Sequence, residues 1–127
     1  MMAVDTSALM AILLGEERGE ACAAALNTDD ELIISAGTVA EALVVAHGRN
    51  LRAQMLRLIE EFGMEVVPVT LGAAQRIAEA YTRWGRGNHR AALNLGDCFA
   101  YEVAKQNACP LLFVGKDFSR TDIKSAL

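Results

Sequence analysis

Four acidic residues occupy surroundings that are otherwise apolar, and they are the residues best suited to chemistry. They are Asp5, Glu41, Asp97 and Asp117. The first and the last come at or just after the ends of short apolar runs, and the other two lie within apolar helical stretches. A buried or half-buried carboxylate is costly unless it is paired, hydrogen-bonded or bound to a metal. Four such residues in one short chain indicate a shared site, which we interpret as that of a divalent-metal nuclease.

A divalent cation would account for these acids. Clustered carboxylates repel one another, so without a cation at least one of them would keep its proton. Mg²⁺ and Mn²⁺ prefer oxygen ligands, and the bound ion can activate a water, orient a phosphate and stabilise a leaving oxygen. His47 and His89 are isolated from each other and from any cysteine, which favours metal-activated water over a histidine base. Thr6 and Ser7 can add a hydroxyl to a ligand-bound water.

Two of the acids also have a structural interpretation at the starts of helices. Asp5 precedes Thr6 and Ser7 and can cap a helix with its carboxylate. Asp97 lies three residues after Asn94, so the two can form a capping box that also complements the helix dipole. Both interpretations are open from the sequence alone.

The other two acids have basic residues nearby that can neutralise them. Glu41 can pair with Arg49 or Arg52 across a helix-packing face. Asp117 can be a turn residue paired with Lys116. The structural interpretation thus needs a separate reason for each of the four acids, whereas one metal site explains them together.

A basic loop rich in glycine precedes Asp97. Its cationic residues surround Trp84 and are Arg83, Arg86, His89 and Arg90. Positive charge beside an aromatic ring suits phosphate contact and base stacking on single-stranded nucleic acid. The alternative is a solvated loop in which Trp84 completes the apolar face of a helix.

Short apolar runs alternate with longer helical patterns, which predicts an α/β fold with a parallel sheet flanked by helices on both faces. Strands are expected at residues 1–4, 32–34, 64–69 and 111–114. Helices are expected after residues 6–7 and at residues 21–26, 36–46, 51–62, 71–84 and 95–106. Their expected caps are Thr6-Ser7, Ser35, Thr70 and Asn94.

This order of elements can bring the four acids together. In open parallel sheets, ligands bind beyond the carboxyl ends of the strands, and Asp5 and Asp117 lie at such ends. Glu41 follows its strand by about two helical turns, and Asp97 stands in the first turn of its helix. Both can therefore lean over the same crevice.

Length and composition indicate one globular domain, residues 1–127. The chain is 53% hydrophobic and 22% charged, and its 16 acidic and 12 basic residues give a formal charge of −4. This balance argues against a general nucleic-acid coat protein but not against a nuclease, because bound metal would neutralise part of the charge.

The remaining features of composition concern location. The three cysteines show no metal-ligand spacing and are expected to be small apolar core residues; they are Cys22, Cys98 and Cys109. Without a signal peptide, the expected compartment is the reducing cytoplasm. No run approaches the roughly 18 apolar residues of a membrane span.

Four segments together resemble the PIN-domain nucleases, and closely the VapC-type toxins of toxin–antitoxin pairs. The segments are MMAVDTSAL, the glutamate of TVAEAL, LNLGDCFAYEVAK and VGKDFSRTDI, and the resemblance spans residues 2–123. The most specific piece is GNHRAALNLGDCFAYEVAK, whereas DTSAL alone would be weak.

The resemblance implies a fold, an activity and a partner. It implies a parallel sheet with helices on both faces, an acidic pocket that binds Mg²⁺ or Mn²⁺, endoribonuclease activity, and a cognate VapB-like antitoxin that blocks the pocket. By motif match, the family's metal-site acids correspond to Asp5, Glu41, Asp97 and Asp117. Asp122 falls where members often carry a further acid, although in a polar tail a solvated role is the alternative.

Other classes of protein fit less well. A haloacid-dehalogenase-type phosphatase would need a second aspartate where Ser7 stands, and a receiver-like domain would need an acidic pair at the first strand. The non-enzyme alternative is a catalytically inactive PIN-fold module that binds an antitoxin. A homodimer is also expected, formed through an apolar face of the helices at 39–45 or 51–62.

Overall fold

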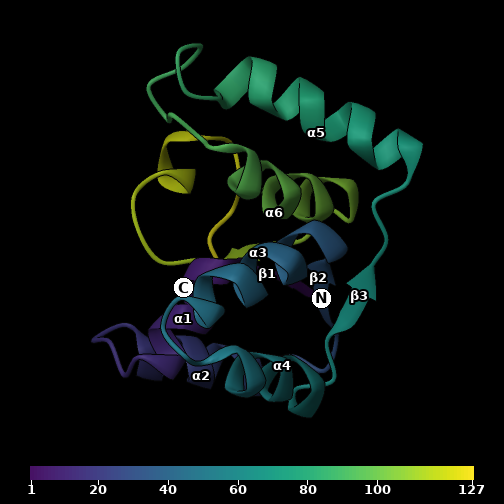
Figure 1. Ribbon diagram of the computed structural model, residues 1–127. Coiled ribbons are helices and arrows are strands. Elements are labelled where there is room, and N and C mark those ends of the chain that lie inside the picture. The colour runs from purple at the N-terminus through teal and green to yellow at the C-terminus, as the bar shows by residue number, and fades with distance from the viewer.

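The computed structural model describes residues 1–127 as a parallel sheet between two layers of helices (Figure 1). The strands are β1 (Met2–Val4), β2 (Leu32–Ser35), β3 (Glu65–Val67) and β4 (Leu111–Leu112). The α-helices are α1 (Thr6–Leu13), α2 (Gly19–Asn27), α3 (Ala36–His47), α4 (Arg52–Glu61), α5 (Leu71–Trp84) and α6 (Leu95–Gln106). A short 3₁₀ helix, η1 (Phe118–Arg120), follows β4. The α/β fold expected from the sequence is confirmed.

The sheet has the order β3-β2-β1-β4, and every pair of neighbouring strands is parallel. The chain moves outward from β1 through β2 to β3, and then returns to the other side of β1 as β4. The strand order thus reverses between β1 and β4, and in open α/β sheets ligands bind beyond the carboxyl ends of the strands at such a point.

Alternate residues of the strands enter two separate hydrophobic cores, because successive side chains of a strand point to opposite faces. Val4 and Ile34 pack with buried residues of α1 to α4 in one core. Ala3 and Ile33 pack with residues of α5, α6 and the following segments in the other. Figure 1 shows the same division, with α5 and α6 on one side of β1 and β2 and with α2 and α4 on the other.

Three of the four expected helix caps are confirmed, and one is corrected. The side chains of Ser35, Thr70 and Asn94 accept main-chain hydrogen bonds at the starts of α3, α5 and α6. The cap of α1 is Asp5 rather than Thr6-Ser7, since the Asp5 carboxylate accepts the Ser7 N–H at 3.0 Å. A carboxylate is as good an N-cap as a hydroxyl, and the Ser7 hydroxyl is used elsewhere.

Two strands are shorter than predicted. β3 covers Glu65–Val67 instead of residues 64–69, because Pro68 has no N–H with which to continue the ladder. β4 covers Leu111–Leu112 instead of residues 111–114. Beyond it, the Val114 N–H donates to the Ser7 hydroxyl at 3.0 Å instead of to a neighbouring strand. None of the helices is long and apolar enough to cross a membrane.

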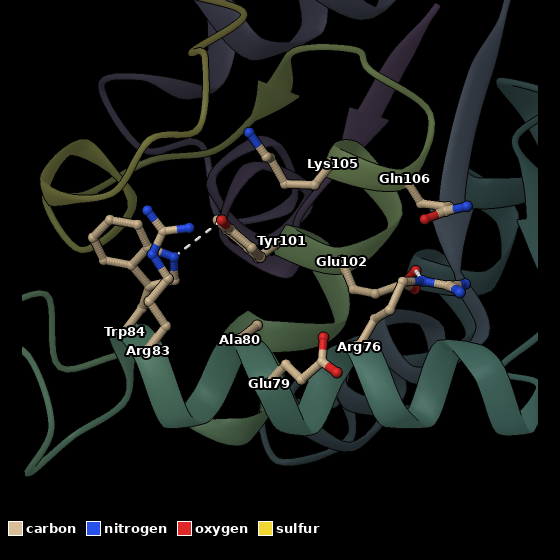
Figure 2. Close-up of a pocket in the computed structure, with 9 residues that line it drawn as sticks. All are labelled: Arg76, Glu79, Ala80, Arg83, Trp84, Tyr101, Glu102, Lys105 and Gln106. Atoms are coloured by element: carbon tan, nitrogen blue, oxygen red, sulfur yellow. Dashed lines mark hydrogen bonds and ion pairs between the residues drawn. The ribbon is translucent and has the colours of Figure 1, made fainter.

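A cavity of about 300 Å³ lies between α5 and α6, away from the four acids (Figure 2). Trp84 is only 8% exposed, and its ring nitrogen donates to the Tyr101 hydroxyl at 3.0 Å, the dashed line in Figure 2. The ring is therefore a core residue that completes the apolar face of α5. Of the two interpretations open for Trp84, the one on the helix face is confirmed and base stacking is not supported, because the ring is buried and the Arg83 guanidinium lies 4.5 Å from its centre.

The same cavity contains an ion pair between a buried carboxylate on α6 and a partly exposed arginine on α5. Glu102 is 7% exposed, and its carboxylate accepts from Arg76 Nε at 2.9 Å. We expect Arg76→Ala to lower the free energy of unfolding by about 1–3 kcal/mol, because it leaves a buried carboxylate unpaired. Urea unfolding should show this loss, whereas Arg52→Ala, which removes an arginine without an ion pair, should change stability by less than about 0.5 kcal/mol. An equal effect of the two substitutions would contradict the prediction.

Candidate metal centre

Asp5 stands at the point where the strand order reverses. Its main-chain N–H donates to Leu112 O of β4 at 3.0 Å, and Ser7 accepts the Val114 N–H. These two bonds join the carboxyl ends of β1 and β4 through the first turn of α1. The sequence prediction that Asp5 lies at the carboxyl end of a strand is thus confirmed.

The Asp5 carboxylate is buried and only half satisfied. It is 3% exposed, and Oδ2 accepts from the Ser7 N–H at 3.0 Å and from the Ser7 hydroxyl at 2.6 Å. Oδ1 is buried without a hydrogen-bond partner. Burial raises the pKa of Asp5 from 3.8 to about 7, the Ser7 hydrogen bonds oppose the rise, and the charges of Asp97 and Glu41 add to it. Asp5 is therefore partly protonated at neutral pH, and burial is a larger cause of this than the repulsion that the sequence suggested.

Glu41 reaches the same place from the middle of α3. Its Oε1 accepts from the Thr6 hydroxyl at 2.6 Å, so the first residue of α1 fixes its orientation. Its Oε2 lies against Gly96 near the start of α6, where a Cβ atom would overlap the carboxylate. Glu41 forms no ion pair, and the alternative of pairing with Arg49 or Arg52 is wrong.

Glycine allows α3 and α6 to approach closely enough for this contact. A Cβ atom on Gly37 would overlap the Phe99 ring, just as one on Gly96 would overlap Glu41. Each helix thus contributes one glycine that receives a side chain of the other. This crossing places the Glu41 carboxylate beside the first turn of α6, which carries Asp97.

The capping role considered for Asp97 is confirmed, and its carboxylate also lies within reach of the charges of the other acids. It forms a capping box with Asn94, in which each side chain accepts the other residue's N–H, at 2.8 Å for Asn94 and 3.0 Å for Asp97. Burial raises the pKa of Asp97 to about 6, the Asn94 N–H opposes the rise, and the charges of Glu41 and Asp117 add to it. Asp97 is therefore both a structural cap and a member of the acidic group.

Asp117 occupies the outer side of the group. It is exposed, stands at the start of η1 and accepts no capping hydrogen bond. Its charge acts on Asp97, and it forms no ion pair with Lys116. The structural alternative of such a pair is wrong, and the Asp117 carboxylate is available to a ligand.

The four acids are neighbours but do not form a closed set of ligands. No three Asp, Glu, His or Cys side chains are arranged to hold a metal ion. Repulsion between like charges keeps carboxylates apart, and their oxygens are the donors that Mg²⁺ and Mn²⁺ prefer. The unpartnered Oδ1 of Asp5 is the feature of this structure that such a cation would satisfy, and in this respect the residues fit a divalent metal.

Asp122 lies outside this group. Its Oδ1 accepts from the Tyr101 hydroxyl at 2.6 Å, and its Oδ2 lies 3.2 Å from Lys105 Nζ and 4.0 Å from Arg83 Nη1. Burial raises the pKa of Asp122, but the bonds to Tyr101 and Lys105 outweigh it, so the net pKa is lowered. Asp122 therefore connects the C-terminal segment to α6, and the alternative of a freely solvated residue is wrong.

Sequence reasoning missed two features of the site. Thr6 was considered as a partner of a ligand-bound water, whereas its hydroxyl orients Glu41. Gly96 was not considered at all, although it stands beside Asp97 in the most specific segment. A glycine in the first turn of a predicted helix is unusual for its low helix propensity, and that signal could have indicated a close contact.

Comparison with known proteins identifies the family of this chain. A sequence model of the PIN domain matches residues 2–124, and the chain belongs to the PIN-domain family. It is similar to ribonuclease VapC36 of Mycobacterium tuberculosis, with 43% identity over 97% of this chain and 91% of VapC36. It is also similar to ribonuclease VapC30 of the same organism, with 38% identity over 96% of this chain and 95% of VapC30. The resemblance found in the sequence is confirmed.

Solved structures share the fold at much lower sequence identity. The crystal structure of VapC20 of Mycobacterium tuberculosis, described as a sarcin–ricin loop cleaving toxin, has a TM-score of 0.77 and 15% identity, and the match covers 97% of this chain and 96% of VapC20. A chain of a toxin–antitoxin complex from Klebsiella pneumoniae has a TM-score of 0.70 and 19% identity, over 96% and 93%.

Proposed function

We propose that this protein is a Mg²⁺- or Mn²⁺-dependent endoribonuclease of the VapC type, the toxin of a toxin–antitoxin pair, acting on RNA in the cytoplasm. The observation that carries the proposal is the buried Asp5 carboxylate with its unpartnered Oδ1, next to Glu41 and Asp97 at the point where the strand order reverses. Similarity to ribonuclease VapC36 over nearly the whole chain supports the reaction class.

The proposed metal-binding residues are Asp5, Glu41, Asp97 and Asp117. A divalent cation held there would supply an activated water and balance the charge of the phosphate. Ser7 donates to Oδ2 of Asp5 and leaves Oδ1 without a hydrogen bond, and Thr6 donates to Oε1 of Glu41 while Oε2, beside Gly96, has no hydrogen bond. Each of the two acids thus keeps one oxygen for a ligand.

The test is cleavage of a mixed RNA pool by purified protein without antitoxin. The reactions contain Mg²⁺, Mn²⁺ or a chelator, and Asp5→Asn is run beside the parent. We expect cutting with either metal and none with chelator or with the variant. Cutting in chelator would overturn the metal dependence, and absence of cutting with every metal would favour the catalytically inactive antitoxin-binding module.

Thr6 is a positioning residue whose effect on the reaction is testable. Thr6→Val keeps the buried shape but removes the donor to Glu41 Oε1, so we expect the cleavage rate to fall about tenfold. Thr6→Ser restores the hydroxyl and should recover most of the rate. Single-turnover cleavage with saturating Mn²⁺ measures both variants, and equal rates for valine and serine would show that the hydroxyl does not orient Glu41.

We propose two protein partners, a VapB-like antitoxin and a second copy of this chain. Apolar side chains on α3 and α4 remain exposed and offer a surface for such contacts, namely Val44, Val45 and Leu56. Light scattering of the purified protein should give the mass of a dimer, and Val44→Asp should shift the mass toward that of the monomer.

Purification together with the product of the adjacent reading frame tests for the antitoxin. Failure of a small DNA-binding protein to co-purify would contradict this partner.

A further inference from the structure

An open hollow of about 360 Å³ adjoins the acidic group where α5 ends and α6 begins. Its lining residues are Tyr81, Arg86, Asn94 and Leu95. Asn94 connects the hollow to the acids, because its main chain and side chain form the capping box with Asp97. The hollow is therefore held at a fixed place next to the proposed metal-binding residues.

The lining combines apolar surface with unused polar groups. Leu95 is 57% exposed at the first position of α6, and Tyr81 is half-buried on α5. The Tyr81 ring packs directly against Gly85, where a Cβ atom would lie 3.0 Å from the ring. Arg86 is exposed and forms no ion pair, and the Asn94 amide nitrogen donates to no protein group.

We propose that this hollow binds one unpaired nucleotide of the RNA, next to the bond that is cut, an inference that rests on the proposed function. Tyr81 and Leu95 contact the base, Arg86 contacts the neighbouring phosphate, and the Asn94 amide donates to the base edge. A volume near 360 Å³ is at the lower end of small-ligand pockets, roughly 300–1,000 Å³, which suits a single nucleotide.

Arg86 supplies the positive charge that a phosphate bound at this hollow requires. The chain has a net charge of −4, and the acids beside the hollow repel a phosphate unless a cation faces it. Arg83 is committed elsewhere, since its guanidinium lies 4.5 Å from the centre of the Trp84 ring and near Asp122. In the basic loop, Arg86 is therefore the residue that contacts RNA, and Trp84 does not.

The substrate class follows from the geometry. A base within a duplex is stacked and paired, and it cannot enter a side pocket without being extruded. The hollow therefore favours single-stranded RNA or the loop of a folded RNA. Because stacking on an aromatic side chain is tolerant of sequence, the hollow selects for an unpaired base over a paired one.

The test is RNA binding by variants of the hollow, measured separately from cleavage. The probe is a fluorescein-labelled, mixed-sequence single-stranded RNA of about 12 nucleotides, followed by anisotropy in EDTA in an Asp5→Asn background, so that no cleavage interferes. Arg86→Ala combined with Leu95→Ala should weaken binding about tenfold. Arg86→Glu alone, a single exposed change, should weaken it at least as much. The probe annealed to its complement should bind at least about tenfold less tightly than the single strand.

A matched control exists elsewhere on the surface. Leu71 is the first residue of α5, is 79% exposed and lies outside the hollow, and Arg57 is exposed on α4. Arg57→Ala combined with Leu71→Ala should leave affinity within about twofold of the starting protein. The proposal is overturned if the two double variants bind the single-stranded RNA with equal affinity. It is also overturned if the protein binds the duplex as tightly as the single strand, or if the protein with an unchanged hollow binds no single-stranded RNA. The cleavage assay of the parent decides the proposed function independently.

Discussion

Asp5→Asn is expected to reduce metal-dependent RNA cleavage at least a hundredfold and to raise the unfolding temperature of the metal-free protein. Loss of the cleavage follows because Asp5 Oδ1 is the buried oxygen offered to the cation, whose charge stabilisation is worth several kcal/mol. A factor of one hundred corresponds to about 2.7 kcal/mol. Asparagine is also a good N-cap and can still accept from Ser7, so α1 should keep its start.

The stabilisation that we expect from Asp5→Asn depends on pH. Asp5 has a pKa of about 7 in the fold and 3.8 as its ordinary value, so its burial disfavours the charged form. The carboxylate therefore does not affect the metal-free fold below about pH 4. Stability falls as the pH rises from about 4 to about 7, because the unfolded chain releases this proton first, and this group causes no further loss above about pH 7. At pH 8 the cost is about 2–4 kcal/mol, and Asp5→Asn should unfold roughly 6–15 °C above the parent. At pH 4 the two should unfold nearly together.

Thermal unfolding in EDTA between pH 4 and pH 8 measures this effect. Asp30→Asn is the matched control, because Asp30 is exposed and makes no side-chain hydrogen bond or ion pair. It should shift the midpoint by no more than about 2 °C. A midpoint for Asp5→Asn that falls below the parent's at pH 8 would show that the carboxylate stabilises the fold and is not an uncompensated charge.

Gly96→Ala is expected to lower the cleavage rate at least about tenfold. The added methyl group would overlap the Glu41 carboxylate and push it out of the acidic group. Overpacking lowers the free energy of unfolding by about 1–3 kcal/mol, and the better helix propensity of alanine offsets up to about 1 kcal/mol of this loss. Stability should therefore change little compared with activity. Single-turnover cleavage and urea unfolding, measured on the same preparation, separate the two effects.

Gly72 provides the control for this substitution. It is the second residue of α5 after a leucine, as Gly96 is the second residue of α6. A Cβ atom there would lie 3.4 Å from Arg76 Nη1 and 3.9 Å from Thr70 Oγ1, which are ordinary contacts. Gly72→Ala should stabilise the protein by about 0.4–1 kcal/mol and leave cleavage unchanged. Similar activity of the two alanine variants would mean that Glu41 does not need its place against Gly96.

The fold could be predicted well from the sequence wherever local chemistry determines it. Ser35, Thr70 and Asn94 marked the helix starts, because a short polar side chain before an apolar periodic segment has few other uses. Strand ends were less predictable. Apolar character continues from Leu112 into Val114, and only the folded structure shows that the Val114 N–H leaves the sheet for Ser7.

The site was predictable by residue type but not by geometry. The four acids were identified because they interrupt apolar segments, a signal that requires no structure. A surface role for Trp84 stayed open beside a place on the apolar face of its helix, because its basic neighbours are visible in the sequence whereas its partner Tyr101 lies 17 positions away. An arginine partner stayed open as the structural alternative for Glu41 for the same reason, although its hydrogen-bond partner, Thr6, lies 35 positions away. Contacts between distant segments decided both cases.

Titration of Mn²⁺ into the metal-free protein by isothermal calorimetry decides whether the four acids form a metal centre. We expect saturable binding to the parent with release of protons near pH 7, chiefly from Asp5, whose pKa of about 7 leaves part of the molecules protonated there; Asp97, with a pKa of about 6, should add to the release at lower pH. Asp5→Asn should bind at least about tenfold more weakly, and Asp30→Asn should bind as the parent does. Equal binding by the parent and Asp5→Asn, or no binding by the parent, would contradict a metal centre built on these acids.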